Sequence, residues 1–194
     1  MLVNPGSSLG GTRPKASVLD DNKNLWIAKF PGKTDMKDTG GWEKVANELA
    51  RNAGINVAHS MIQKFSNWGA NVENDLKELW RRIVFNLFIS NTDDHLRNHG
   101  FILTEKGWIL SPAFDINTNE DGSGLALNIS LDDNSLDLDL PLEVVEYFRL
   151  NKKSGLEIIE RIRKSVSSWP NFANKYRLPK SEQVIMARAL NRFL

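Results

Sequence analysis

Residues 91–98 read Asn91-Thr92-Asp93-Asp94-His95-Leu96-Arg97-Asn98, a polar run set between two apolar stretches. Before it, residues 72–90 place their apolar side chains on one face of a helix. After it come two short apolar pieces, 101–103 and 108–110, joined by Glu105-Lys106-Gly107, which is typical of a hairpin turn. We therefore expect a long helix that delivers the polar run to the base of a small hairpin.

A third carboxylate follows this hairpin. Asp115 lies in Ser111-Pro112-Ala113-Phe114-Asp115-Ile116, and because a hairpin returns the chain to where it began, we expect Asp115 near Asp93 and Asn98. Two carboxylates and an amide form an oxygen-ligand site, which suits Mg²⁺ held together with substrate phosphates. A purely structural role is equally well supported by this stretch alone, since Asp and Asn also cap helices and form turns.

The two histidines of this region suggest a different site, a metal hydrolase that uses them with Asp93 and Asp94. His95 and His99 are four residues apart, a spacing that puts both on one face only within a helix. Residues 98–100, Asn-His-Gly, form helices poorly. We therefore favour His95 as a buried, hydrogen-bonded organiser of the loop over His95 as a metal ligand.

The N-terminal part carries features of a phosphate site. Gly6-Ser7-Ser8-Leu9-Gly10-Gly11 is glycine-rich, and glycines let backbone N–H groups approach phosphate oxygens closely. Lys29 lies near the end of the otherwise apolar stretch 25–30, either at a solvated edge or reaching an anion, and Glu43 in the next predicted helix could pair with it. A glycine-rich loop, a strand Lys, a helix Glu, an Asp with an Asn five residues on and a later Asp follow the order of the parts used in phosphoryl transfer by kinases.

Strand patterns dominate the N-terminal part and helical patterns the C-terminal part, which predicts an α+β protein with two unequal lobes. The predicted strands are residues 16–19 and 25–30, and the helix after them is 42–53. From about residue 142 onward the pattern is helical in three blocks, broken near Asn151 and at Pro170 and Pro179.

Tryptophans and acidic residues outside the polar run have plainer explanations. Trp42, Trp80 and Trp169 lie at the spacing of helix core positions, so we predict that they pack in the core. For Trp26, which is near Lys29 in the sequence, two interpretations stay open: a core residue, or a residue that lines an adenine pocket. The acidic residues of 132–139 alternate with leucines, which favours an extended segment with one solvated face.

Composition limits the classes of function. The 194 residues include 25 Lys and Arg against 24 Asp and Glu, a formal net charge of +1, whereas proteins that grip nucleic acid or anionic membranes need a large positive field. The absence of cysteine excludes disulfides, thiolate zinc sites and cysteine nucleophiles. No apolar run reaches the roughly 18 residues that span a membrane. We expect a cytoplasmic protein with no direct contact to nucleic acid or membrane.

The chain resembles the HipA-like serine/threonine kinases, the toxins of bacterial toxin–antitoxin modules. The central motif of the resemblance is Asn-x-Asp-x-His-x-Arg-Asn at 91–98, followed by Ser-Pro-Ala-Phe-Asp at 111–115. The other matching stretches are Ser8-Leu9-Gly10-Gly11-Thr12-Arg13-Pro14-Lys15, Ile27-Ala28-Lys29-Phe30, Glu43 with residues 49–54, residues 125–130 and the C-terminal helices. The resemblance implies a protein-kinase-like fold as a single domain, 1–194, with a small strand-rich N-lobe (about 1–68) and a helical C-lobe (about 69–194).

The resemblance also implies the roles of the polar residues. Asp93 is expected to orient the substrate hydroxyl and accept its proton. Asn98 and Asp115 are expected to hold Mg²⁺, and ATP is the expected phosphate donor. Lys29 is expected to contact the nucleotide phosphates, with Glu43 as its partner. The remaining residues of the expected nucleotide site are Ser8, Leu9, Gly10, Gly11 and His95.

Regulation and partners are implied in the same way. Ser8 aligns with a loop serine that family members autophosphorylate to inactivate themselves, and Ser7 is the adjacent alternative. A HipB-like helix-turn-helix antitoxin and a protein substrate, by analogy an aminoacyl-tRNA synthetase, are the expected partners. HipA-like toxins usually carry an extra N-terminal subdomain, so this chain is a compact relative, or one completed by a separate polypeptide, or one from which that subdomain has been removed.

Two other functions remain open from the sequence. One is a catalytically silent ATP-binding module with a regulatory or antitoxin-like role. The other is a kinase of a small molecule or lipid headgroup, because an Asp-x-His loop with a later Asp also occurs in relatives of the phosphoinositide kinases.

Overall fold

A computed structural model gives the fold, and it describes residues 2–3, 15–19, 25–29, 37–56, 72–105 and 107–194. The first three of these ranges form an antiparallel sheet in the order β1 (Leu2–Val3), β2 (Lys15–Leu19), β3 (Leu25–Lys29). Lys15 pairs with Lys29 at one end of the β2–β3 ladder. The predicted strand pair is therefore confirmed at the level of the backbone.

The first helix, α1 (Thr39–Asn52), begins at an aspartate cap. The Asp38 side chain accepts a hydrogen bond from the Gly41 N–H at 2.9 Å, which satisfies one of the free donors at the helix start. Beyond the helix end Gly54 has φ +81°, the left-handed geometry that glycine adopts without strain. The helix predicted over 42–53 is confirmed, and it begins three residues earlier than expected.

The long helix and the hairpin after it are also confirmed. Helix α2 (Val72–Phe88) leads through the polar run, which contains the short 3₁₀ turn η1 (Leu96–Asn98), into β4 (Phe101–Thr104) and β5 (Gly107–Leu110). These two strands pair antiparallel, Phe101 with Leu110.

The C-terminal part is helical, with breaks close to those predicted. It contains α3 (Asp139–Glu143), η2 (Val145–Phe148), α4 (Lys152–Val166), α5 (Trp169–Lys175) and α6 (Lys180–Leu190). Asn151 caps α4, and Pro179 directly precedes α6. Pro170 lies inside α5, in its first turn, where the missing N–H of proline costs no hydrogen bond.

The acidic segment before α3 is not the extended segment that we expected. Its only regular pairing among the described residues is an isolated bridge between Gly124 and Ser135. Asp133 instead accepts a hydrogen bond from the Ser135 N–H at 2.8 Å. Short local bonds of this kind let Asp and Ser form turns in place of a ladder. The predicted solvated face is present, because Asp137 and Asp139 are exposed while Leu138 is half-buried and Leu140 is buried.

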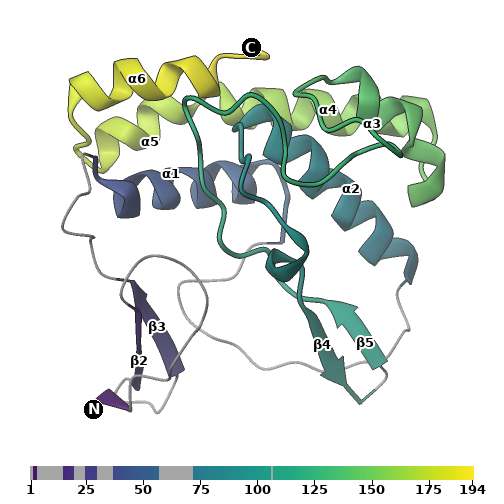
Figure 1. The fold of residues 1–194 in the computed structure, drawn as a ribbon, viewed down its shortest axis with the longest axis horizontal. Helices are drawn as coiled ribbons and strands as arrows, with labels where there is room; N and C mark the ends of the chain where they lie inside the picture. Colours follow the sequence, from purple (N-terminus) through teal and green to yellow (C-terminus); the bar gives the residue numbers. More distant parts are fainter. Residues whose placement is uncertain (1, 4–14, 20–24, 30–36, 57–71, 106) are drawn as a thin grey trace.

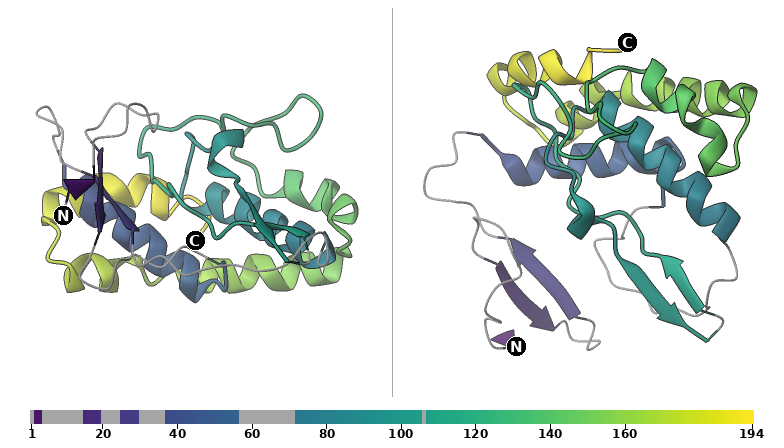
Figure 2. Two further views of the ribbon diagram at one scale, coloured as in Figure 1. Left: turned by 90° about the horizontal axis from the view of Figure 1, so that it is seen from below. Right: turned by 45° about the vertical axis from the view of Figure 1, so that its right-hand side comes forward.

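The core lies where α1 and α2 pack against α4, α5 and α6 (Figure 1). Trp80 is fully buried, and Trp42 and Trp169 are nearly so. The ring centroids of Trp42 and Trp169 lie 6.0 Å apart. The predicted packing role of these three residues is confirmed. The β2–β3 pair and the β4–β5 hairpin both extend from the same side of the helical layer (Figures 1 and 2).

Helices dominate the described residues more strongly than the α+β expectation implied. The strands are short, five residues at most, and the two sheets stay separate. None of the described helices is both long and apolar enough to cross a membrane.

Candidate functional site

The polar run leaves α2 through a left-handed turn. Ser90 has φ +51°, the Ser90 N–H bonds to the Leu87 carbonyl at 3.0 Å, and the Asn91 N–H bonds to the Asn86 carbonyl at 2.8 Å. This pair of bonds is the Schellman arrangement, in which glycine usually occupies the left-handed position. The turn directs residues 91–99, the catalytic-loop candidate, away from the helix axis.

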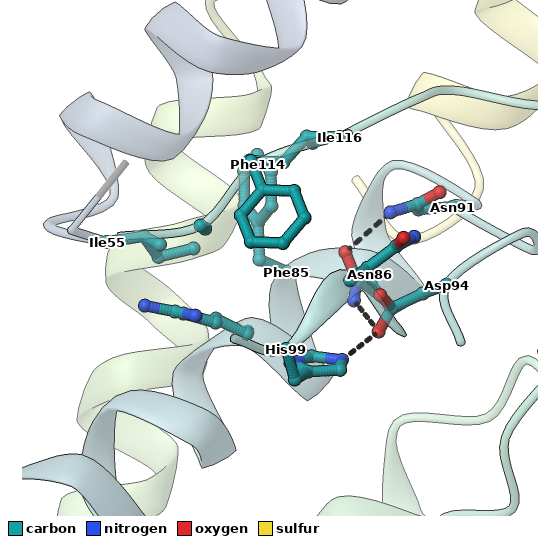
Figure 3. A pocket seen from close by; sticks show the side chains of 11 residues that line it. Ile55, Phe85, Asn86, Asn91, Asp94, His99, Phe114 and Ile116 are labelled. Carbon is teal, nitrogen blue, oxygen red and sulfur yellow. Dashed lines mark hydrogen bonds and ion pairs between the residues drawn. The ribbon is translucent and has the colours of Figure 1, made fainter. Parts of the chain in front are cut away.

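Side chains tie this loop back to α2 (Figure 3). Asn86 Nδ2 donates to Asp94 Oδ2 at 2.7 Å, and Asn91 Nδ2 donates to Asn86 Oδ1 at 3.0 Å. His99 Nε2 lies 2.9 Å from the same Asp94 oxygen. The loop is therefore held at its start, middle and end.

The second loop, residues 111–122, lies beside the first. The Ser111 N–H bonds to the Gly100 carbonyl at 2.8 Å, and the Asn119 N–H bonds to the Ser90 carbonyl at 3.1 Å. The Ala113 N–H bonds to the Asn56 carbonyl at 2.7 Å, beyond the end of α1. The second loop is thus fixed to Ser90 and Gly100, the residues on either side of the first loop. The return of the chain through the hairpin predicted this proximity.

Close packing adds to these bonds at Thr92. The Asn119 side chain donates to Thr92 Oγ1 at 2.7 Å. A Cβ placed on Gly122 would lie 2.4 Å from Thr92 Cγ2, so only glycine fits there without movement. Thr92 is the residue directly before Asp93, and the second loop therefore limits where Asp93 can lie.

The three expected acid and amide residues lie on these two loops. Asp93 is exposed, and its carbonyl accepts a hydrogen bond from Asn98 Nδ2 at 3.4 Å. Asn98 is buried. Asp115 is half-buried on the second loop with φ +58°, and Asn117 Nδ2 donates to its carbonyl at 3.3 Å. The structure brings Asp93 and Asn98 into contact and puts Asp115 on the adjoining loop.

The expectation for His95 holds only in part. Its carbonyl accepts the Asn98 N–H at 2.8 Å, but its buried Nδ1 has no hydrogen-bond partner among the described residues. The side chain that organises the loop is His99. Among the described residues, no group of three or more His, Asp or Glu side chains could hold a metal ion.

Most of the expected nucleotide residues lie outside the described part of the chain. This applies to Ser7, Ser8, Leu9, Gly10 and Gly11, and only the backbone of Lys29 and of Trp26 is described, within β3. Glu43 lies half-buried in the first turns of α1, and its carbonyl accepts the Asn47 side chain at 2.8 Å. The Lys29–Glu43 pair therefore stays a prediction.

Two residues that shape this region are Arg82, which sequence reasoning missed, and Asp94, which it considered only for the metal-hydrolase alternative. Both line a small cavity behind the first loop, with Asn86, Asn98 and His99. Arg82 Nη2 donates to the Ser111 carbonyl at 2.7 Å, and burial lowers the pKa of Arg82 although Glu78 acts to raise it. The available signal was Asn86, one polar residue within the apolar run 83–89.

Comparison with solved structures identifies the class of fold. The HipA chain of Shewanella oneidensis MR-1, solved with HipB and its operator DNA, aligns over 98% of this chain with 15% identity and a TM-score of 0.66. The Helicobacter pylori proinflammatory kinase CtkA aligns over 98% of this chain and 96% of its own, with 15% identity and a TM-score of 0.50. The chain therefore has a kinase-like fold.

The family follows from the sequence comparison. The profile of the HipA-like C-terminal domain matches residues 7–73 and 66–170, so the chain belongs to this family. It spans 65% of the length of the Shewanella HipA chain. No curated protein matches it.

Proposed function

We propose that the chain is an ATP- and Mg²⁺-dependent protein serine/threonine kinase of the HipA type. The observation that carries the proposal is the pair of adjoining loops in a kinase-like fold, one with Asp93 in contact with Asn98 and the other with Asp115. Phosphoryl transfer needs positioning and charge neutralisation more than covalent help. Two loops fixed to each other and to α2 supply that positioning.

Asp93 contacts the hydroxyl group of the substrate. Its side chain is exposed while its backbone is held by Asn98 and by the packing of Thr92. A carboxylate that is fixed in position but open to solvent is able to orient a serine or threonine hydroxyl and to accept its proton.

Asn98 and Asp115 fit a magnesium site. Asn98 donates its amide nitrogen to the Asp93 carbonyl, which leaves the oxygen Oδ1 as the atom for the metal. Asp115 supplies a carboxylate, and its left-handed backbone, φ +58°, is a strained geometry of the kind that clusters at functional sites. Bound with ATP, Mg²⁺ would neutralise charge on the phosphate oxygens.

Strand β4 offers a surface for the adenine base. Phe101 and Leu103 are 61% and 50% exposed, and because they are two residues apart they face the same side of the strand. They directly follow Asn98 and the first loop. We place the base against this face, with Lys29, Glu43 and residues 8–11 on the phosphates.

The likeness to HipA suggests the biological setting. The Shewanella HipA was solved with HipB and its operator DNA, so we propose a HipB-like antitoxin as partner of this chain and a toxin role for the kinase. A protein substrate such as an aminoacyl-tRNA synthetase, and autophosphorylation at Ser8 or Ser7, are the corresponding proposals for its targets.

Site variants test this function. Asp93→Asn is expected to lower phosphate transfer from ATP by about 10² to 10⁴ while ATP still binds. Asp115→Asn is expected to weaken the binding of ATP in the presence of Mg²⁺. The exposed Asp132 provides a matched control, and Asp132→Asn should change neither. A wild-type chain that binds ATP but transfers no phosphate would instead be the silent regulatory module.

A further inference from the structure

Asp94 and Asp93 are neighbours that differ in exposure. The Asp93 side chain is exposed, whereas the Asp94 side chain is only 13% exposed and is directed toward α2 (Figure 3). Asp94 makes its contacts with Asn86 and His99, and it is not a residue of the proposed ATP or Mg²⁺ site.

We propose that Asp94 is a positioning residue, which fixes Asp93 and Asn98 for phosphate transfer by anchoring residues 91–99 to Asn86 of α2. The inference rests on the proposed function, because Asp93 and Asn98 have their roles from it. The anchor itself is a structural property and is measurable without any activity.

The anchor has a defined polarity. A carboxylate only accepts hydrogen bonds, so Asn86 Nδ2 and His99 Nε2–H both donate to Asp94 Oδ2. Asn86 has its amide nitrogen toward Asp94 and its oxygen toward Asn91 Nδ2. The Asn86 amide therefore has a single orientation in which both of its polar atoms are bonded.

Burial makes this orientation hard to abandon. Asn86 is 6% exposed, and the side chains of Asp94 and His99 are each 13% exposed. A buried polar group that loses its partner pays its full desolvation cost, so the loop cannot shift without breaking bonds that water would not replace. Residues 91 and 99 bracket both Asp93 and Asn98, and the anchor therefore controls the two together.

Exchanging the amide and the carboxylate tests the anchor. Asn86→Asp alone puts two carboxylates where the present atoms lie 2.7 Å apart, with no proton donor between them. Adding Asp94→Asn restores these bonds with their direction reversed: one hydrogen of the new amide nitrogen goes to the new carboxylate, which also accepts from Asn91, and the other goes to His99 Nε2, which accepts in the tautomer protonated at Nδ1. The double variant keeps the composition of the pair and only reverses its direction.

The expected result is loss and rescue. A displacement of about 1 Å in such a site costs about 100-fold in rate, so Asn86→Asp should lower phosphate transfer about 100-fold and the double variant should recover most of that loss. Asp94→Asn alone should lose less, because its oxygen still accepts both bonds, although neutral hydrogen bonds are about half as strong. Asp132→Asn is the matched control.

Hydrogen exchange of the backbone amides of 91–99 separates the two hypotheses. These amides should exchange faster in Asn86→Asp and return to the wild-type rate in the double variant, whether or not the chain transfers phosphate. If the wild type transfers no phosphate, the proposed function is wrong. The anchor is then tested by hydrogen exchange alone. The inference would be overturned if the double variant transferred phosphate as slowly, and exchanged its amide hydrogens as fast, as Asn86→Asp. It would also be overturned if Asn86→Asp had the wild-type rates of transfer and of exchange. If Asn86→Asp does not fold, the double variant and Asp94→Asn provide the same comparison with wild type.

Discussion

Arg82 joins three segments of the chain through one buried guanidinium. It is 3% exposed, its Nε donates to Glu78 Oε1 at 3.1 Å, and its Nη2 donates to the Ser111 carbonyl at 2.7 Å. Glu78, itself 8% exposed, also accepts the Asn56 N–H at 3.0 Å. The pair therefore connects α2 with the end of α1 and with the start of the second loop.

We expect Glu78→Gln to destabilise the fold by about 3 kcal/mol, because breaking a buried ion pair leaves an uncompensated charge behind. The measurement is the free energy of unfolding in denaturant. Glu73→Gln is the matched control on the same helix, where Glu73 pairs with Lys77 at the surface, and its unfolding should not change measurably. Equal effects of the two substitutions would show that the buried pair does not hold the loop.

Gly122 tests the contact between the two loops. A Cβ at this position meets Thr92 Cγ2 at 2.4 Å, so Gly122→Ala should push Thr92, and with it Asp93, out of place. We expect a fall in phosphate transfer of about 10-fold or more, since small displacements are costly at such sites. Gly124→Ala, where the nearest atom lies at 3.4 Å, is the control. A Gly122→Ala variant that transfers phosphate as fast as the wild type would contradict this interpretation of the contact.

Local sequence patterns predict the helices and strands of this chain, but they do not predict which polar residues become buried. The apolar spacing of 72–90 predicted α2, in which residues 78, 80, 82 and 84–88 are buried. It could not separate Arg81 from Arg82, of which only the second is buried. In the same way, the family motif singles out Asp93, but no local pattern predicts that Asp94 is the less exposed of the two, because tertiary packing decides their burial.

Helix α4 has a cap whose contribution is measurable. Asn151 Oδ1 accepts the Ser154 N–H at 2.9 Å. Asn151→Ala should lower the free energy of unfolding by about 1 kcal/mol, the usual effect of removing such a cap. Lys153→Ala, an exposed change in the first turn of the same helix, is the comparison. An Asn151→Ala protein as stable as the wild type would mean that water replaces the cap.

Contacts at the start of α1 join segments that are far apart in the sequence. The Glu182 carboxylate of α6 accepts hydrogen bonds from the Trp42 Nε1–H at 2.9 Å and the Asp38 N–H at 3.1 Å. Lys37 donates to Glu120 on the second loop at 2.7 Å. The N-terminal end of α1 therefore connects the C-terminal helix with the loop that carries Asp115.

The Lys37–Glu120 contact predicts an acid-sensitive stability. Burial raises the pKa of Glu120, but the hydrogen bonds from Lys37 and from its own backbone lower it more, and the pKa lies below its ordinary 4.5. Because the pKa is depressed in the folded state, this contribution is present above pH 4.5 and is lost as the pH falls through the folded value.

Glu120→Gln should therefore destabilise the chain at neutral pH, and its difference from wild type should shrink below pH 4.5. Thermal unfolding across this pH range measures it, with the exposed Glu157→Gln on α4 as the control. A difference between Glu120→Gln and wild type that stays constant with pH would show that the contact is not electrostatic.

At this scale the sequence predicted the meeting of the two loops through the hairpin, and the division into an N-lobe and a C-lobe stays a prediction. It did not predict the contacts that align them, because Lys37 with Glu120 and Arg82 with Ser111 join residues far apart along the chain. Such pairs leave no local pattern. The roles of Lys29, Glu43 and residues 7–11 stay predictions.

The central claim is that this chain transfers the γ-phosphate of ATP by means of Asp93. The most direct test is the intact mass of the unphosphorylated protein after incubation with ATP and Mg²⁺, beside an Asp93→Ala control. We predict a gain of one phosphate, mapped to Ser8 or Ser7, in the wild type and none in the control. An unchanged mass in a protein that binds ATP, or an equal gain in Asp93→Ala, would contradict the account.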